Sequence, residues 1–254
     1  LHWFKWESYT TWLSGFTLLC VVYYGSGASF LIDSSVRDLT QTQATLISLG
    51  LLPAALVVYE LLWATPLAKD NRLFGVVGVS LLAALAYGLT HVFSGRGAFL
   101  QLGATIGTVM AANVFFRIIP SQRHMIAATQ AGQPVDPSYG LRAKGRSVHN
   151  HYLTFPVLFT MLSNHFPSTY GHAHAWVVVI VLFVFGVSLK YAMNFRGKTH
   201  PFVFGSLATS LGAFVFLTMP GKESLPGLEQ YTNAKPVSFA TVNRWEGGAN
   251  LPQK

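Results

Sequence analysis

Charged residues are scarce in this chain. Only 10% of its 254 residues are Asp, Glu, Lys or Arg, whereas 51% are hydrophobic, and the mean hydropathy is +0.41. A soluble domain is usually about a quarter charged, so this composition excludes an ordinary water-soluble globular protein. The apolar residues are spread along the whole length and leave no separate polar half. We therefore expect an integral membrane protein with several spans.

Cysteine is nearly absent as well. Cys20 is the single cysteine, and it lies inside an apolar stretch. One cysteine excludes an internal disulfide, a cysteine-based zinc site and the CxxCH motif that attaches haem c covalently. We therefore expect no covalent haem c on this chain.

The net charge of +8 raises the question of nucleic-acid binding. The basic residues, however, fall in the loops between apolar segments, as the topology of membrane proteins predicts. We therefore exclude nucleic acid as a partner and expect the lipid bilayer instead. The strand alternation of a membrane β-barrel is missing too, so the predicted fold is all-α, a polytopic bundle of transmembrane helices.

Seven apolar segments are long enough to cross a hydrocarbon core of about 30 Å, which takes about 20 helical residues. They cover residues 8–24, 44–63, 73–94, 98–120, 148–166, 173–193 and 200–219. These segments define the predicted transmembrane domain, residues 1–220, and residues 221–254 are expected to form a polar tail. The connection 121–147 is the longest on the side rich in lysine and arginine, and the stretch QAGQPVDPSYG within it is predicted to form turns and irregular chain.

Lysine and arginine are distributed unevenly between the two sides of these spans. One side's short loops hold only Arg37 and Arg96. The other side holds Lys5, Lys69, Arg72, Arg117, Arg123, Arg142, Lys144, Arg146, Lys190, Arg196 and Lys198. The positive-inside rule predicts that the N-terminus of this chain is cytoplasmic and its C-terminus extracytoplasmic. The expected location is the bacterial inner membrane or an equivalent energy-transducing membrane.

The stretch GRSVHNHYLTFPVLFTMLSNHF, residues 145–166, carries histidines at both ends of an apolar run. His151 and His165 are fourteen residues apart. On a continuous helix they face nearly the same direction and stand about 21 Å apart along the axis. One helix with this spacing can ligate two haems stacked across a membrane, an arrangement that cytochrome b-type bundles resemble. We therefore predict His151 and His165 as ligands of haem b, one near each face.

A second imidazole would complete each iron site. His91 ends the third span at about the depth of His165, so these two form the predicted outer pair. The partner of His151 stays open, and the candidates are His2, His124, His200 or a residue of another chain. In the alternative interpretation, these histidines are interfacial hydrogen-bonding groups that bind no metal.

Five further polar residues are predicted to converge on the cytoplasmic side. They are Glu60, Arg117, Arg146, His149 and Asn150. Charged groups at such depth pair with one another or serve a site, because an isolated charge in hydrocarbon is costly. The set therefore has two interpretations: a binding and catalytic cluster, or a group of snorkelling and interfacial ion pairs.

Two long and unusual stretches carry a family resemblance: LHWFKWESYTTWLSGF at 1–16 and GRSVHNHYLTFPVLFTMLSNHFPSTYGH at 145–172. They, and the chain as a whole, resemble the membrane domain of the bacterial membrane-bound urate oxidase, or urate hydroxylase, family. The resemblance implies an inner-membrane protein of about eight helices followed by a periplasmic cytochrome c domain. It also implies oxidation of urate toward 5-hydroxyisourate, with the electrons passing to haem. This chain is expected to start after the family's first helix and to lack the cytochrome c domain, so a separate cytochrome c domain or subunit is the expected partner.

Oxidation of urate needs a place for a planar anion, a base for a ring N–H and an electron sink. Arg117 or Arg146 can bind the anion through a guanidinium fork, with Asn150 beside them. His149 or Glu60 is the candidate base. Haem b would then carry the electrons outward.

Two alternatives belong to other functional classes. The first is a non-catalytic structural or electron-transfer subunit, bound to the other subunits of a larger respiratory or photosynthetic membrane complex. The expected lack of a cytochrome c domain favours it. The second is a transporter, which fits less well because the sequence has no evident inverted repeat and little charge at the bilayer midplane.

Overall fold

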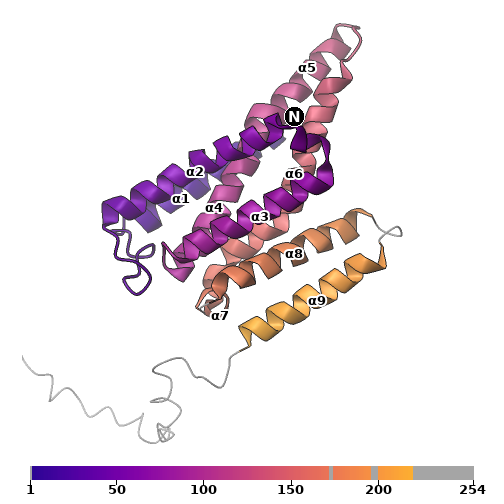
Figure 1. The fold of residues 1–254 in the computed structure, drawn as a ribbon. Helices are drawn as coiled ribbons and strands as arrows, with labels where there is room; N and C mark the ends of the chain where they lie inside the picture. Colours follow the sequence, from indigo (N-terminus) through magenta and orange to yellow (C-terminus); the bar gives the residue numbers. More distant parts are fainter. Residues whose placement is uncertain (1, 172–173, 196–199, 220–254) are drawn as a thin grey trace, which may run out of the picture. The chain divides into compact units, whose positions relative to one another are not determined.

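The computed structural model describes residues 2–171, 174–195 and 200–219, and it is all-α in this part of the chain. The α-helices are α1 (His2–Leu19), α2 (Gln41–Ala64), α3 (Asn71–Thr90), α4 (Gly95–Asn113), α5 (Ile119–Gln130), α6 (Pro137–Leu162), α7 (Pro167–Tyr170), α8 (Ala175–Asn194) and α9 (Pro201–Thr218) (Figure 1). Shorter segments join them: the π-helices η1 (Cys20–Tyr24) and η3 (Val114–Ile118), and the 3-10 helices η2 (Pro66–Lys69) and η4 (Ser163–His165). The predicted all-α fold is thus confirmed.

Each of the seven predicted spans overlaps an α-helix of the described residues. Five of the described helical stretches are long and apolar enough to cross a membrane: Gln41–Ala64, Arg72–Thr90, Gly95–Gln130, Ala175–Asn194 and Pro201–Thr218. The predicted spans 8–24 and 148–166 correspond to α1 and α6, which are helical but more polar. Lys5 and Glu7 lie near the start of α1, and a polar run from Arg146 to His151 interrupts the hydrophobic pattern of α6. The composition is that of an integral membrane protein.

The chain divides by its contacts into a helical unit, Leu1–Thr218, and a second unit, Met219–Lys254. The predicted polar tail, 221–254, lies outside the described residues. We therefore describe the helical unit alone.

The prediction of turns and irregular chain over QAGQPVDPSYG, residues 130–140, is confirmed for residues 131–136 and wrong for residues 137–140. α5 continues to Gln130 and α6 begins at Pro137, so only residues 131–136 are non-helical. The Asp136 carboxylate caps α6 by accepting a hydrogen bond of 2.8 Å from the Ser138 backbone N–H, which lowers the pKa of this exposed carboxyl. Pro137 suits the first helical position, where its missing N–H costs nothing. The turn residues therefore mark a helix start, and α5 and α6 form a helical hairpin (Figure 1).

Two α-helices pass into π-helical segments. α1 runs into Cys20–Tyr24, and α4 runs through Val114–Ile118 directly into α5. A π turn inserts an extra residue into the helical register, and such segments often occur at functional sites. The first segment carries Tyr23 and the second carries Arg117, and both side chains belong to the polar groups described below.

α4 is the helix around which the others pack, because it contacts α1, α2, α3 and α6. The crossing with α6 is closest at Gly103. A methyl group there would lie 2.6 Å from Oγ1 of Thr160 and 3.0 Å from Cε of Met161, so a larger residue would push the helices apart. α8 approaches α6 similarly at Gly186, where a methyl group would lie 3.0 Å from Cδ of Pro156. Small residues at such crossings permit close packing of membrane helices.

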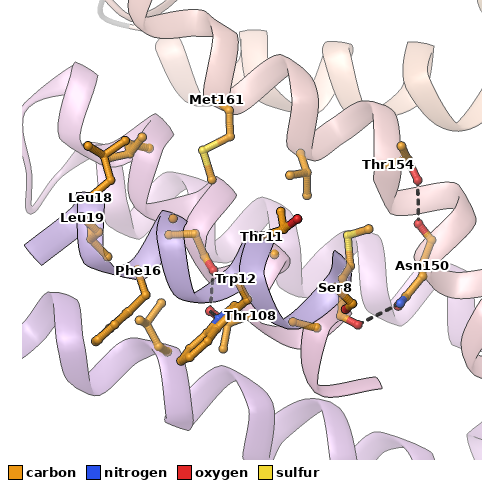
Figure 2. A pocket seen from close by; sticks show the side chains of 18 of the residues that line it. Ser8, Thr11, Trp12, Phe16, Leu18, Leu19, Thr108, Asn150, Thr154 and Met161 are labelled. Carbon is orange, nitrogen blue, oxygen red and sulfur yellow. Dashed lines mark hydrogen bonds between the residues drawn. The ribbon is translucent and has the colours of Figure 1, made fainter. Parts of the chain in front are cut away.

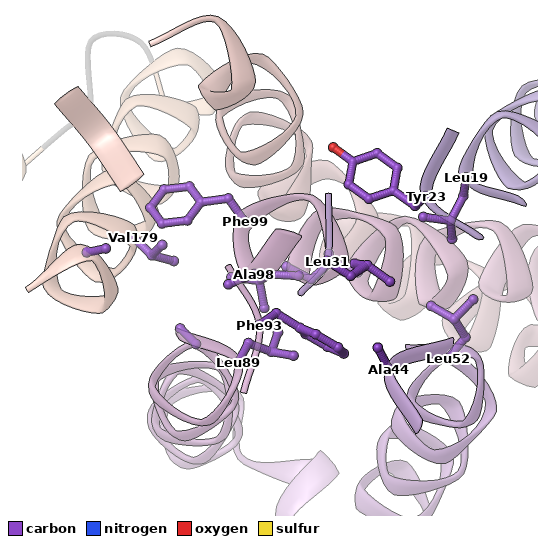
Figure 3. Packing of buried hydrophobic residues seen from close by; sticks show 14 of the residues in the cluster. Leu19, Tyr23, Leu31, Ala44, Leu52, Leu89, Phe93, Ala98, Phe99 and Val179 are labelled. Atoms are coloured by element: carbon purple, nitrogen blue, oxygen red, sulfur yellow. The ribbon is translucent and has the colours of Figure 1, made fainter. Parts of the chain in front are cut away.

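The main hydrophobic cluster joins α1, the connection that follows it, α2, α3, α4 and α8. Figure 3 shows its members, among them Leu19, Leu31, Leu52, Leu89, Phe93, Phe99 and Val179. A buried polar contact lies beside this cluster. The Ser48 hydroxyl of α2 donates to Oε1 of Gln101 of α4 at 2.6 Å, and Nε2 of Gln101 donates to the Ser48 carbonyl at 2.7 Å. Neither side chain is exposed, so the pair fixes how α2 and α4 align.

Candidate functional site

Glu60 of α2 accepts hydrogen bonds from two arginines. Nη2 of Arg117, in η3, lies 2.5 Å from Oε2, and Nη1 and Nη2 of Arg146, in α6, lie 2.7 Å from Oε1 and 3.1 Å from Oε2. The side chain of Arg146 is 5% exposed, that of Glu60 29% and that of Arg117 41%. One carboxylate between two guanidinium groups leaves a formal charge of +1. The predicted convergence of these three residues is therefore found in the structure.

Two asparagines and a tyrosine extend this arrangement. Asn113, which is fully buried at the end of α4, accepts a hydrogen bond of 3.0 Å from Nη1 of Arg146. Its Nδ2 donates to the Tyr59 hydroxyl at 3.0 Å and to Oδ1 of Asn150 at 2.8 Å. Nδ2 of Asn150 donates in turn to the Met110 carbonyl at 2.8 Å. We call Tyr59, Glu60, Asn113, Arg117, Arg146 and Asn150 the Glu60 network.

His149 lies at the edge of the Glu60 network among aromatic rings. Its Nδ1 and the Tyr59 hydroxyl share a hydrogen bond of 3.3 Å. Its ring centroid is 5.0 Å from that of Trp63 and 4.9 Å from that of Phe74. The Arg146 guanidinium stands 4.3 Å above the Trp63 ring, so the same indole supports both residues. The structure thus joins all five residues of the predicted cluster.

Tyr59 and Asn113 were not among the predicted site residues, although they hold the Glu60 network together. The sequence contains a signal for one of them, because Asn113 lies one helical turn before Arg117. A polar residue one turn from a charged one inside an apolar span is a reason to expect contact between them.

A cavity of about 940 Å³ runs between α1, α4 and α6, and we call it the α4–α6 cavity. Figure 2 shows Trp12 and Phe16 of α1, Thr108 of α4 and Met161 of α6 around it. Nε1 of Trp12 donates to the Thr108 hydroxyl at 3.1 Å, which ties α1 to α4 at the cavity wall. Most of the lining is apolar, and polar side chains gather toward its ends.

Asn150 connects the Glu60 network to the α4–α6 cavity. It lines the cavity together with Ser147, His151 and Thr154 of the same helix. Glu60, Arg117, Arg146 and His149 are not among the lining residues that the structure describes, so they stand behind Asn150 and Asn113. Of the predicted substrate-binding and catalytic residues, Asn150 therefore borders the cavity, whereas Glu60, Arg117, Arg146 and His149 do not.

Both predicted haem ligands of the 145–166 stretch line the α4–α6 cavity. His151 lies on α6, and its Nε2 donates to Oδ1 of Asn194 at 2.6 Å. His165 lies on η4, because α6 ends at Leu162. The predicted continuous helix to residue 166 is therefore wrong over its last turn, where a 3-10 turn replaces the α-helical register. The two histidines nevertheless face one cavity.

His91 lies elsewhere in the described bundle. It follows the last residue of α3, donates a hydrogen bond of 2.7 Å from Nδ1 to the Tyr87 carbonyl, and stacks on the Tyr87 ring at 4.1 Å. It is not among the described residues that line the cavity containing His165. Its pairing with His165 stays a prediction.

Two of the candidates for the second ligand of His151 have local contacts. His124 stacks on Tyr139 with ring centroids 4.7 Å apart, and Nδ1 of His200 accepts a hydrogen bond from the Phe202 backbone. Within residues 2–171, 174–195 and 200–219, no group of three or more His, Cys, Asp or Glu side chains is arranged to hold a metal ion. A site built from several protein ligands is therefore not found there, whereas haem needs only one or two imidazoles.

Comparison with known proteins gives one match. A model of the family described as urate oxidase N-terminal matches residues 1–219. No curated protein and no solved structure matches the chain.

Proposed function

The chain belongs to the urate oxidase N-terminal family, and we propose that it is a membrane-bound oxidoreductase of the urate-oxidase type. It would oxidise urate and pass the electrons through haem b to a cytochrome c domain or subunit. One observation carries this proposal: the match covers residues 1–219 and therefore includes the whole Glu60 network and the whole lining of the α4–α6 cavity. The five helices that can cross a membrane support a membrane-bound enzyme, in the bacterial inner membrane or its equivalent.

The proposed reaction adds a hydroxyl group to C5 of urate. Its oxygen comes from water, and the oxidation releases two electrons and two protons. The electrons reduce two equivalents of cytochrome c, which is the oxidant. Cytochrome c accepts one electron at a time. Transfer of the two electrons through a haem relay therefore fits this acceptor better than direct transfer from urate to the cytochrome.

The Glu60 network is proposed to bind and orient the substrate from one end of the cavity. Asn150 makes the direct contact, because it lines the cavity and its amide is fixed by Asn113 and the Met110 carbonyl. Arg117 and Arg146 contribute the positive charge that attracts an anion. Glu60 holds both guanidinium groups in place, and His149 supports the network through Tyr59. In this proposal Glu60 and His149 act as positioning residues instead of direct bases.

The lining of the cavity fits haem b in its chemistry. It has imidazoles from His151 and His165 and a mainly apolar wall between them. The hydrogen bond from His151 to Asn194 leaves Nδ1 of the ring for a metal and fixes the orientation of the imidazole. Haem bound there would supply one-electron acceptance. The chain's own residues would bind it, exclude water and set its orientation.

The test is a visible spectrum of the protein purified in detergent, followed by anaerobic addition of urate. We expect low-spin haem b bands that urate reduces, and we expect Asn150→Ala to slow this reduction. Haem bands that urate leaves oxidised would contradict the enzyme and favour the electron-transfer subunit of a larger complex. A protein without haem would exclude the relay.

The ligands are tested separately. His151→Ala and His165→Ala should each remove part of the low-spin haem signal, whereas His124→Ala, which changes a histidine outside the cavity, should leave it intact. His91→Ala examines the predicted outer pair, which requires the same spectral loss as His165→Ala. Unchanged haem in the His151 and His165 variants would mean that these residues serve only as polar groups of the wall.

A further inference from the structure

The far end of the α4–α6 cavity holds a second set of polar side chains. Tyr23, Arg96 and Asn164 line it next to His165, the proposed haem ligand, and we call these three residues the Arg96 end. Arg96 lies in the first turn of α4 and Asn113 is its last residue, so the Arg96 end and the Glu60 network are about 25 Å apart along this helix. We propose that the Arg96 end is a separate binding site for a small planar heterocyclic anion.

Arg96 is fixed in position by its neighbours. Ser94 caps α4: its hydroxyl accepts from the Gly97 backbone N–H at 3.0 Å and donates to the Phe30 carbonyl at 2.7 Å. A methyl group at Gly97 would lie 3.0 Å from that same carbonyl oxygen, and one at Gly95 would collide with the Tyr170 carbonyl. The two glycines therefore press the backbone on both sides of Arg96 against other segments. The arginine is built into the fold and does not sit on a mobile loop.

The positive charge of Arg96 is not neutralised by a neighbouring carboxylate. The ion pairs among the described residues all involve Glu60. The Arg96 guanidinium stands 4.9 Å above the Phe30 ring, and its Nε is buried without a hydrogen-bond partner. The first turn of a 19-residue helix adds partial positive charge at the same place. An anion is the ligand that would satisfy both features.

Asn164 narrows the class of anion. Its Oδ1 is buried and has no hydrogen-bond partner, so this atom requires a donor. Tyr23 lines the cavity together with Arg96 and Asn164, and its side chain is almost fully buried. A ligand that fits all three must offer acceptor oxygens to Arg96 and a hydrogen-bond donor to Asn164. A lipid phosphodiester and an ionised carboxylate have no donor. Inorganic phosphate has only the hydroxyl of a compact tetrahedral ion, whereas a planar heterocyclic anion with ring amides offers both groups side by side.

Urate has this combination of groups, so the inference rests on the proposed function for the identity of the natural ligand. The site itself does not depend on it. On the topology predicted from lysine and arginine, the Arg96 end faces the extracytoplasmic side. It would then be the first anion site that a substrate meets on entering the cavity from that side.

The experiment measures binding without redox chemistry. The purified protein is dialysed to equilibrium against orotate, a planar anion with ring amides that is not oxidised under these conditions. The wild-type protein should bind orotate at two sites, and Arg96→Gln should weaken one of them at least tenfold, because a buried charge-assisted contact is lost, while the site at Asn150 is retained. Arg37→Gln removes an exposed arginine outside the cavity and should leave the affinity unchanged. Arg96→Lys keeps the charge without the planar fork and should give an intermediate value.

Asn164→Leu tests whether the ligand must donate a hydrogen bond to Asn164. It also provides a second test of the site if Arg96→Gln fails to fold. It should weaken orotate but leave benzoate, a planar anion without N–H groups, at wild-type affinity. An unchanged number of orotate sites in Arg96→Gln would overturn the site, and so would a single orotate site in the wild-type protein that Arg117→Gln removes. Displacement of orotate by phosphate at equal concentration would also overturn the site. A loss of haem in Arg96→Gln with unchanged orotate binding would overturn it as well. Orotate binding at Arg96 without reduction of haem by urate would contradict the proposed function and leave this site standing.

Discussion

Replacing Arg146 by methionine tests whether the Glu60 network is a structural unit. The substitution keeps an apolar stem of similar length but removes two hydrogen bonds to Glu60, one to Asn113 and the guanidinium contact with Trp63. Loss of one partner from a buried ion pair costs about 3–5 kcal/mol. Glu60 keeps Arg117, so we expect the lower end of that range, about 3 kcal/mol.

The assay is thermal unfolding of the purified protein in detergent, followed by intrinsic fluorescence. For a chain of this size, 1 kcal/mol shifts the midpoint by about 2–4 °C, so Arg146→Met should lower it by about 6–12 °C. Arg117→Met is the matched control. It removes the same chemical group, but from a side chain that is 41% exposed and makes a single hydrogen bond to Glu60, so we expect about 1 kcal/mol or less.

A double-mutant cycle separates the ion pair from the packing of the stem. Glu60→Gln with Arg146→Met should be less destabilising than the sum of the two single changes, because the double variant leaves no uncompensated carboxylate. Equal effects of Arg117→Met and Arg146→Met would refute the reasoning, since burial would then not determine the cost. Strict additivity in the cycle would refute it as well.

Two further predictions concern packing and topology. Gly103→Leu should destabilise the protein by about 1–3 kcal/mol through overpacking, because Thr160 and Met161 occupy the space beside Gly103. Gly107→Leu should have a much smaller effect, because the space around Gly107 is open. The same thermal unfolding assay compares the two variants. A cysteine at Ser224 should react with an impermeant thiol reagent in intact cells and one at Ser138 should not; the reverse pattern would invert the predicted topology and the direction of electron flow.

The positions of the helices could be predicted from the sequence because hydrocarbon imposes a length and a composition on every span. The hairpin of α5 and α6 could not be predicted, because an Asp-Pro pair such as Asp136 and Pro137 occurs both in turns and at the start of helices. The convergence on Glu60 was predictable, since charges in apolar spans need partners. The separation of the Glu60 network from the α4–α6 cavity could not be predicted, because it depends on the π segment that carries Arg117 and on the amide contacts of Asn113.

The Arg96 end shows a different limit. The sequence places Arg96 in a short loop between spans, where an arginine is expected to be solvated. Gly95 and Gly97 look like loop residues until their close contacts with Tyr170 and Phe30 are known. Contacts between segments that are far apart in sequence decide whether such an arginine is free or fixed, and a single sequence carries little information about them.

The helical stretch Gly95–Gln130 has 36 residues and is therefore about 54 Å long, well beyond a hydrocarbon core of about 30 Å. Arg96 stands at its beginning and Arg117 about 32 Å further along. On the topology predicted from lysine and arginine, the two arginines would lie near the two boundaries of the bilayer, and α5 would continue past the second one into the aqueous phase. Because Arg117 is tied to Glu60 and Arg96 is fixed by its glycines, the protein has little freedom to rise or sink in the membrane. A bilayer with a thinner or thicker core would have to deform around the protein, and the activity should depend on the acyl-chain length of the lipid.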